Sequence, residues 1–293
     1  MTAPRVYGAS PIRRARATKA EVQARRQALF DIVAEQQPMT VRQIFYQGVV
    51  TGLVEKEETG YDKVQADLTK MRVEGWLPYD WLTDSTRWQR KPRSFGSIED
   101  ALSETARFYR KSLWHEADKY VEVWIEKDAL AGVVYPVTAL YDVSLMSARG
   151  YASLSFLHEA ASYVASLEKP AFIYHLGDFD PSGVDASEKI EQKLREFAPR
   201  ADITFERLAV TEQQIAGWRL PTRPTKKTDS RSKRFGEISV ELDAISPENL
   251  RALLERALNR HLPQRQLEIL KVAEASEREL IASLVGEMRP RNG

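Results

Sequence analysis

Two aspartates follow an apolar run that has the composition of a buried strand. The run, Ala171-Phe-Ile-Tyr-His-Leu176, is followed by a glycine and then by Asp178 and Asp180, before a proline and a second glycine interrupt the pattern. Residues i and i+2 of an extended segment point to the same side, so both carboxylates are expected to face one point beyond the strand. Such a pair repels itself unless a cation intervenes, and Mg²⁺ prefers oxygen ligands. The alternative is an Asp-rich turn that caps the next helix.

A third carboxylate ends an earlier strand-like segment. Val121-Glu-Val-Trp-Ile-Glu-Lys127 alternates with the period of a strand, and Asp128 then opens a helical stretch. Ligands of parallel sheets bind beyond the carboxyl ends of the strands, where Glu126 and the Asp178/Asp180 pair are both expected. The spacing therefore predicts three acidic side chains around one Mg²⁺. The alternative is that Glu126 pairs with the neighbouring lysine or with an arginine and serves packing alone.

Strand and helix patterns alternate through the middle of the chain. After the first strand and helix, the apolar periods predict strands at about 143–146, 172–176 and 203–210, and helices at about 152–167 and 185–197. Alternating βα units are typical of an α/β domain with a parallel sheet. From 247 to 288 the pattern is helical with a break at His261-Leu-Pro263, and its apolar spacing indicates packing or a dimer surface.

Composition limits the function classes. The chain has 293 residues, enough for two domains, and a formal net charge of +1, which excludes a global basic field for nucleic acid. It has no cysteine, which excludes disulfides, thiol nucleophiles and cysteine zinc sites, and its four histidines lack a His-x-x-x-His spacing. No segment is apolar and long enough to span a bilayer, and no apolar signal core is present. We therefore expect a soluble cytoplasmic protein without membrane contact.

Residues 1–17 are predicted to form a mobile basic arm. The segment carries Arg5, Arg13, Arg14 and Arg16 among small residues and prolines. Such an arm can touch a phosphate backbone, although solvated disorder explains the same composition. An Arg-rich, acid-poor start is also typical of a transit peptide.

Three short helices are predicted after this arm. Capping boxes at Thr18-Lys-Ala-Glu21 and Thr40-Val-Arg-Gln43 start two helices, and a third spans about 61–74. A short β excursion follows, and the order resembles a winged helix-turn-helix whose third helix enters the major groove. The candidate phosphate contacts on the third helix are Lys63, Lys70 and Arg72. The alternative is a small helical cap domain with solvated charges.

Tyr46 lies on the second of these helices, away from the apolar face centred on Ile44 and Phe45. It shares a side with Arg42, four residues earlier. A guanidinium beside a phenol favours phenolate and can hold a phosphate oxygen, so Tyr46 is a candidate nucleophile. The alternative for a tyrosine at a helix edge is half-buried packing with a solvated hydroxyl.

These segments resemble the A subunit of type IIB DNA topoisomerases (topoisomerase VI) and the related meiotic double-strand-break transesterases. Val41-Arg-Gln-Ile-Phe-Tyr46 is similar to the family's Arg-x-Ile-Tyr/Phe-Tyr motif, in which the last tyrosine is the nucleophile. The resemblance therefore implies catalytic roles for Tyr46 and Arg42. It covers most of the chain, from about residue 20 to about residue 260.

The acidic segments carry the more specific part of the resemblance. Val123-Trp-Ile-Glu-Lys-Asp128 is similar to the strand that supplies the catalytic glutamate of the family's Toprim domain, here Glu126. His175-Leu-Gly-Asp-Phe-Asp-Pro-Ser-Gly183 is similar to the family's Gly-Asp-x-Asp-Pro-x-Gly, which makes its two aspartates metal ligands together with Glu126. Ser239-Val-Glu-Leu-Asp-Ala244 looks like the family's Glu-Leu-Asp-Ala segment.

The resemblance implies a fold and a reaction. A mostly helical winged-helix DNA-binding domain, here residues 18–95, precedes a Rossmann-like Toprim domain with a parallel sheet, here residues 96–288 with the C-terminal helices. Tyr46 would attack a phosphodiester of double-stranded DNA and leave a 5′-phosphotyrosyl end and a free 3′-hydroxyl, while Mg²⁺ neutralises charge. The resemblance also implies a nucleoid-associated homodimer in which the tyrosine and the metal come from different protomers.

Partners and alternative functions follow from the same comparison. The sequence has no Gly-x-x-x-x-Gly-Lys loop, so ATP-driven strand passage would need a separate ATPase subunit. A Toprim nuclease would use water in place of Tyr46, as in bacterial defence systems that pair a Toprim protein with an ATPase complex. A non-catalytic DNA-binding adaptor would keep the fold alone. The basic stretch Arg219–Phe235 is predicted to be a DNA-contacting loop or, equally, a solvated surface.

Overall fold

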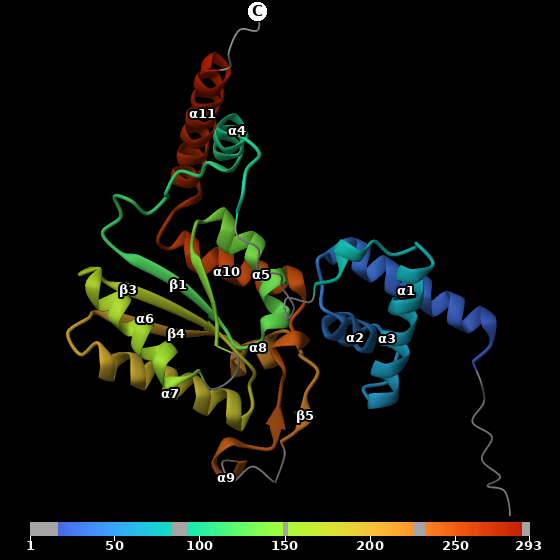
Figure 1. Cartoon of the computed structure of the whole chain (residues 1–293). Coiled ribbons are helices and arrows are strands. Elements are labelled where there is room, and N and C mark those ends of the chain that lie inside the picture. The colour runs from blue at the N-terminus through green and yellow to red at the C-terminus, as the bar shows by residue number, and fades with distance from the viewer. Residues whose placement is uncertain (1–16, 84–92, 149–151, 226–231, 289–293) are drawn as a thin grey trace, which may run out of the picture.

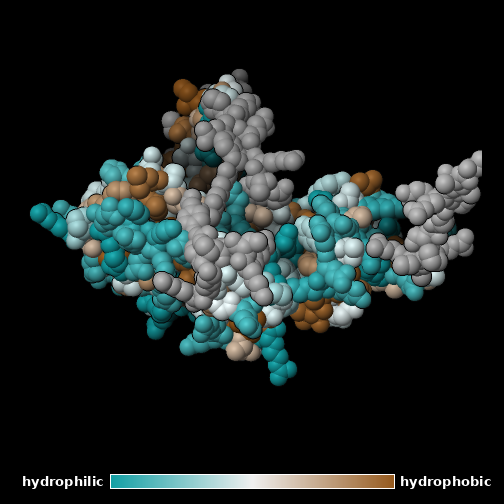
Figure 2. Space-filling view, turned by 90° about the horizontal axis from the view of Figure 1, so that it is seen from below, coloured by the Kyte–Doolittle hydropathy of each residue, from teal (hydrophilic) through white to brown (hydrophobic). Residues whose placement is uncertain are grey.

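The computed structural model describes residues 17–83, 93–148, 152–225 and 232–288 of the chain. Residues 1–16 of the predicted basic arm lie outside the described residues, and so do residues 84–92, where most of the predicted β excursion falls. None of the described helices is long and apolar enough to cross a bilayer. Figure 2 shows mostly hydrophilic residues on the face seen from below, with separate apolar patches.

The N-terminal region is helical, as predicted. Its elements are α1 (Lys19–Gln36), α2 (Val41–Val50), α3 (Glu58–Val73) and the short 3-10 turn η1 (Tyr79–Trp81). Thr18 and Thr40 form the predicted capping boxes of α1 and α2. The inward face of α3 is fully buried at Val64, Leu68 and Met71.

Four parallel strands form the central sheet. In the order in which they lie side by side, they are β2 (Ser144–Ser147), β1 (Tyr120–Ile125), β3 (Ala171–Leu176) and β4 (Ile203–Ala209). Every pair of neighbours is parallel, and Trp124 of β1 is aligned with His175 of β3. The predicted parallel α/β sheet is confirmed, and its arrangement is Rossmann-like.

Helices cover both faces of the sheet (Figure 1). They are α5 (Asp128–Leu140) and α10 (Pro247–Asn259) on one face and α6 (Leu154–Ser166) and α7 (Pro181–Phe197) on the other. Val123 of β1 packs in the core with α5 and α10, whereas Trp124 packs in the core with α6 and α7. Both faces of β1 are buried, as is typical of a parallel sheet, and even Glu122 is only 2% exposed.

The remaining segments close the carboxyl edge of the sheet and form a projecting arm. The edge carries α8 (Glu212–Gly217), β5 (Arg223–Pro224), α9 (Ser232–Phe235), β6 (Ile238–Ser239) and the 3-10 turn η2 (Leu242–Ala244). The arm consists of α4 (Ile98–Phe108) and α11 (Gln264–Met288), which pack on each other and extend away from the sheet (Figure 1). The predicted helical C-terminal region, with its break at 261–263, is confirmed.

One hydrophobic core joins the N-terminal helices to the sheet. Leu29 of α1 and Ile44 of α2 belong to the same cluster of buried side chains as Val123 of β1 and Leu250 of α10. α2 also contacts η2 directly. The N-terminal helices are therefore docked beside the carboxyl edge of the sheet, where the acidic residues lie.

Candidate functional site

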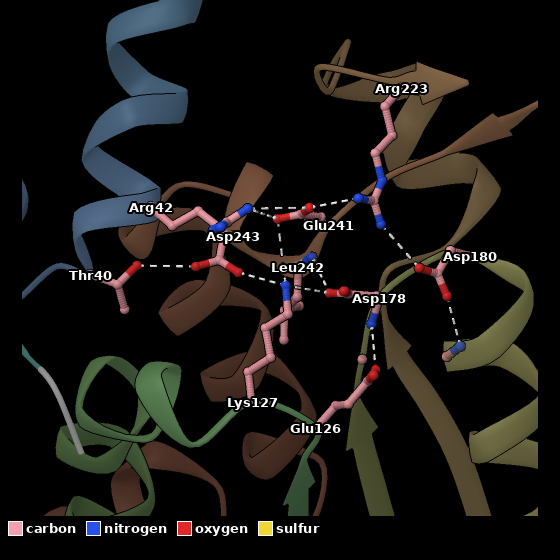
Figure 3. A network of polar contacts seen from close by, with 12 residues as sticks. Thr40, Arg42, Glu126, Lys127, Asp178, Asp180, Arg223, Glu241, Leu242 and Asp243 are labelled. Carbon is pink, nitrogen blue, oxygen red and sulfur yellow. Dashed lines mark hydrogen bonds and ion pairs between the residues drawn. The ribbon is translucent and has the colours of Figure 1, made fainter. Parts of the chain in front are cut away.

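The carboxyl ends of β1 and β3 bring Glu126 next to the Asp178/Asp180 segment, as predicted (Figure 3). The backbone N–H of Asp178 donates a hydrogen bond to Oε2 of Glu126 over 2.9 Å. Burial raises the pKa of Glu126, and the charges of Asp178 and Asp180 raise it further. The three carboxylates therefore share one neighbourhood and repel one another within it.

Two glycines make room for the Glu126 carboxylate. A Cβ atom at Gly177 would lie 2.7 Å from Oε2 of Glu126, and one at Gly183 would lie 2.5 Å from the backbone oxygen of Asp178. Both distances are closer than real Cβ contacts, so any larger residue would displace the backbone or the carboxylate. The glycines of this segment thus hold Glu126 against the N-terminus of α7.

The two aspartates turn to different partners. Oδ1 of Asp178 accepts a hydrogen bond from the Leu242 backbone N–H over 2.8 Å and lies 3.0 Å from Nζ of Lys127. Oδ1 of Asp180 accepts from the Gly183 N–H over 2.8 Å and caps α7, as the alternative interpretation predicted. Within the described residues, no group of three or more acidic or histidine side chains is arranged to hold a metal ion.

The donor chemistry of these carboxylates nevertheless fits a hard cation. All the candidate ligands are carboxylate oxygens, the type that Mg²⁺ prefers. Burial raises the pKa of Asp178 as well as that of Glu126, so neither charge is fully compensated by its present partners. Ligation would require Asp178 to leave Lys127 and Asp180 to leave Arg223, whose Nη2 lies 3.1 Å from Oδ2 of Asp180.

Lys127 connects this edge to a second acidic segment. Its Nζ lies 2.8 Å from Oδ2 of Asp243 and 3.6 Å from Oε2 of Glu241, in addition to its contact with Asp178. Burial favours a lower pKa for Lys127, but the three carboxylates outweigh it and raise the pKa. Lys127 therefore stays charged at every physiological pH.

Glu241 joins cations from three different elements (Figure 3). Its carboxylate lies 3.1 Å from Nη1 of Arg42 on α2 and 3.0 Å from Nη1 of Arg223 on β5. Burial favours a higher pKa for Glu241, but the charges of Lys127, Arg42 and Arg223 outweigh it and lower the pKa. We name Arg42, Lys127, Arg223, Glu241 and Asp243 the ion-pair hub.

The ion-pair hub connects α2 to the carboxyl edge of the sheet. Some of its contacts were not predicted from the sequence patterns. The Thr40 hydroxyl, at the start of α2, donates to Oδ1 of Asp243 over 3.1 Å. The available signal was the Glu-x-Asp spacing of the Glu-Leu-Asp-Ala segment, which repeats the carboxylate spacing of Asp178 and Asp180. Arg223, predicted to lie in a DNA-contacting or solvated loop, is instead bound internally. Lys226, Lys227 and Arg231 of that loop lie outside the described residues.

Tyr46 is buried, contrary to the prediction that it lies away from the apolar side of its helix. It is 4% exposed, and its ring packs 5.4 Å from that of Phe45. Burial and the Glu241 carboxylate raise the pKa of Tyr46 to about 12, outweighing the opposite effect of Arg42. Arg42 favours the phenolate, as predicted, but burial and the Glu241 carboxylate, with which Arg42 is paired, outweigh its effect.

Arg207 of β4 is a further, partly buried cation at this edge that sequence reasoning missed. It donates to the backbone oxygens of Gly177 over 3.0 Å and Gly183 over 3.2 Å, and also to that of Asp178. Burial lowers its pKa, although the nearby carboxylates oppose the shift. Its positive charge holds together the loop that carries the aspartates. A lone arginine in a strand pattern gives no signal for such a role.

Two of the three α3 residues predicted to contact phosphate already interact with other groups of the protein. Lys70 lies 3.7 Å from Glu74, and the Arg72 guanidinium lies 5.5 Å from the centre of the Tyr79 ring. Lys63 is exposed. These positions are compatible with a charged outer face on α3, and DNA contact there stays a prediction.

Comparison with protein-family models and with curated proteins gives no match for this chain. What the geometry defines is an α/β protein whose Rossmann-like parallel sheet carries an acidic cluster at its carboxyl edge, with a helical N-terminal region docked beside it.

Proposed function

We propose that the chain is a Mg²⁺-dependent DNA-cleaving transesterase that resembles the topoisomerase VI A subunit, with double-stranded DNA as its substrate. The observation that carries this proposal is the junction between α2 and the acidic edge. The Arg42–Glu241 and Thr40–Asp243 contacts place the tyrosine-bearing helix beside the segment that also binds Lys127 and Asp178. A phosphodiester transesterification needs a nucleophile and an acidic metal site at one phosphate. The resemblance takes the two from different protomers, whereas the docked α2 brings both to one edge within a single chain.

In the proposed reaction, the Tyr46 oxygen forms a bond to a DNA phosphorus atom. The bond from phosphorus to the 3′ oxygen breaks, the phenolic proton is lost, and the 3′ oxygen leaves as a hydroxyl. Glu126, Asp178 and Asp180 would hold Mg²⁺, which supplies charge neutralisation at the phosphate. Arg42 positions a phosphate oxygen once its guanidinium is released from Glu241. With a pKa of about 12, Tyr46 is neutral near pH 7, so the exchange of Arg42 must accompany its activation.

A water-using nuclease is the second candidate. It is favoured by the 4% exposure of Tyr46, because a buried phenol must be uncovered before it can reach DNA, whereas water needs no such movement. The same acidic edge would then bind the metal and orient the water. Any strand passage driven by ATP would belong to a separate ATPase subunit.

Trapping with end-labelled DNA and Mg²⁺ distinguishes the two reactions. The transesterase gives a covalent protein–DNA adduct that is lost in Tyr46→Phe and in Asp178→Asn but retained in Tyr61→Phe, a nearby tyrosine that serves as the matched control. The nuclease gives nicked DNA without an adduct, retained in Tyr46→Phe and lost in Glu126→Gln. If the chain binds DNA but gives neither the adduct nor nicked DNA, the remaining candidate is a non-catalytic DNA-binding adaptor.

A further inference from the structure

Lys56, in the loop between α2 and α3, lies over the ring of Tyr46. Its Nζ atom is 5.4 Å from the centre of the ring, within the range of a cation–π contact. The same ammonium group donates a hydrogen bond to the backbone oxygen of Thr222, the residue directly before β5. Lys56 therefore connects the helical region to the edge of the sheet across the buried tyrosine.

The other cations near Tyr46 are held by carboxylates, whereas Lys56 is held by a carbonyl oxygen. Arg42, Lys127 and Arg223 each lie within 3.1 Å of at least one carboxylate oxygen. Lys56 forms no ion pair with any residue that the structure describes, and its hydrogen bond goes to Thr222. Of these four cations, Lys56 is thus the one that can meet an incoming anion without giving up an ion pair.

The surroundings of Lys56 compensate its charge only in part. Burial lowers the pKa of Lys56, Glu241 opposes this shift, and Arg223 adds to it. Burial acts in the same direction on Arg42 and Lys127, but nearby carboxylates outweigh it there and raise the pKa of both. An anion placed beside Lys56 would supply the missing compensation.

Backbone contacts fix the loop that carries Lys56. The N–H of Leu53 donates to the Gly48 oxygen over 2.8 Å, which turns the chain back against the end of α2. A Cβ atom at Gly60 would lie 2.2 Å from the backbone oxygen of Glu55, so a glycine is needed for α3 to start this close to the loop. The backbone of Lys56 is therefore held in place, while its long side chain can exchange one partner for another.

We propose that Lys56 binds a DNA phosphate beside Tyr46, the phosphate that the tyrosine attacks in the proposed reaction. The inference rests on the proposed function, because it takes double-stranded DNA as the ligand. In this step the ammonium group exchanges the Thr222 oxygen for a phosphate oxygen. A lysine binds phosphate as a point charge with three donors. Lys56 makes this contact before Arg42 leaves Glu241, because it gives up a hydrogen bond to a carbonyl and not an ion pair.

The sequence around Lys56 conceals this role. Glu55 precedes it, and Glu57 and Glu58 follow it, which is the composition of a solvated acidic loop. All three glutamates are exposed. Their charges oppose a general attraction of DNA to the loop, so we expect Lys56 to contact one phosphate and not to form part of a broad basic surface.

Binding of a fluorescein-labelled DNA duplex, followed by anisotropy over a salt series in EDTA, tests the contact without cleavage. Lys56→Gln should bind more weakly than the parent, and the slope of log K against log salt concentration should be smaller by about one. Lys193→Gln is the matched control, a similarly exposed lysine on α7, and should keep the parental slope. An unchanged slope in Lys56→Gln, or a parent chain that does not bind DNA, overturns the proposal.

Adduct trapping with Mg²⁺ separates this proposal from the proposed function. Lys56→Gln should form the covalent adduct at least about tenfold more slowly, because a charge at the phosphate is lost, and Lys56→Arg should stay closer to the parent. An adduct formed by Lys56→Gln at the parental rate overturns the role of Lys56 and leaves the transesterase intact. A smaller slope with no adduct in any chain supports the phosphate contact and overturns the transesterase. The glutamine amide can still donate to Thr222, and urea unfolding verifies that each variant is folded.

Discussion

Tyr46 lies among charges of both signs, and the pKa of its hydroxyl should respond to each of them. Burial and Glu241 raise the pKa of Tyr46 to about 12, while Arg42 and Lys127 oppose the shift. Glu241→Gln keeps the shape of the side chain and removes its charge, so we expect the pKa of Tyr46 to fall. Ultraviolet titration of tyrosinate measures it as the difference between each chain and its Tyr46→Phe counterpart.

The matched control for this titration is Glu279→Gln, an exposed glutamate on the projecting arm. It should leave the pKa of Tyr46 where it is in the parent. Circular dichroism at each pH verifies that the chain is still folded. If the pKa of Tyr46 is unchanged in Glu241→Gln, the ion-pair hub does not control the protonation of Tyr46.

Glu122 links protonation to the stability of the sheet. It is 2% exposed, and burial raises its pKa from 4.5 to about 7. The folded state therefore favours the protonated carboxyl. Its contribution is fully present below about pH 4.5, declines as the pH rises, and is lost above about pH 7. The difference between these two pKa values corresponds to about 3 kcal/mol of unfolding free energy.

Glu122→Gln is neutral at every pH and should remove this loss. We expect it to unfold with a free energy up to about 3 kcal/mol above the parent at about pH 8, and close to the parent at about pH 4. Urea unfolding curves at several pH values measure the difference. If both chains lose stability in parallel between these pH values, other buried carboxylates such as Asp178 cause the slope.

Sequence patterns could predict which residues are neighbours at strand ends but not which partners they choose. The parallel-sheet rule is enough to bring Glu126 near Asp178. The partners of Asp178, by contrast, include Leu242, which lies 64 positions away and has no local signal. The burial of Tyr46 was not predicted, for a related reason. A helical wheel assumes one buried face, whereas α2 is covered on a second side by the segment that contains Glu241.

At the scale of elements, helix starts were predicted correctly where the capping motif is local, at Thr18 and Thr40, and incorrectly at α7. The helix after Asp180 was predicted from residue 185, because Pro181 and Gly183 looked like breakers. The structure begins α7 at Pro181 instead. Proline is favoured in the first turn of a helix, where its missing N–H costs nothing, and Asp180 provides the cap. The capping boxes at Thr18 and Thr40 were predicted correctly, since both motifs are local.

These two capping boxes form a matched pair that isolates the docking of α2. Thr18 is exposed, and its hydroxyl serves α1 alone, whereas the buried Thr40 also donates to Asp243. Thr18→Ala should cost about 1 kcal/mol of unfolding free energy, the usual value of a cap. Thr40→Ala should cost about 1–2 kcal/mol more, because it leaves a buried carboxylate oxygen without its donor. Equal costs in urea unfolding would show that the Asp243 contact contributes nothing.

At the scale of the whole molecule, the continuous core determines how the chain unfolds. Leu29 of α1 is fully buried, in the same cluster as Val123 of β1, although the sequence suggested two domains divided near residue 95. Leu29→Ala should therefore lower the unfolding free energy by about 2–5 kcal/mol for the entire core. Hydrogen exchange should become faster by the same factor for the slowest amides of α1 and of β3.

The reason is that a shared core couples the two regions, so opening one exposes apolar surface of the other. Leu154→Ala, at a position 60% exposed, is the control and should leave exchange in both regions unchanged. Faster exchange confined to α1, α2 and α3, with β3 protected as in the parent, would instead mean that the helical region opens on its own. In that case Tyr46 could be uncovered without unfolding the sheet, which is the movement that the proposed transesterification requires.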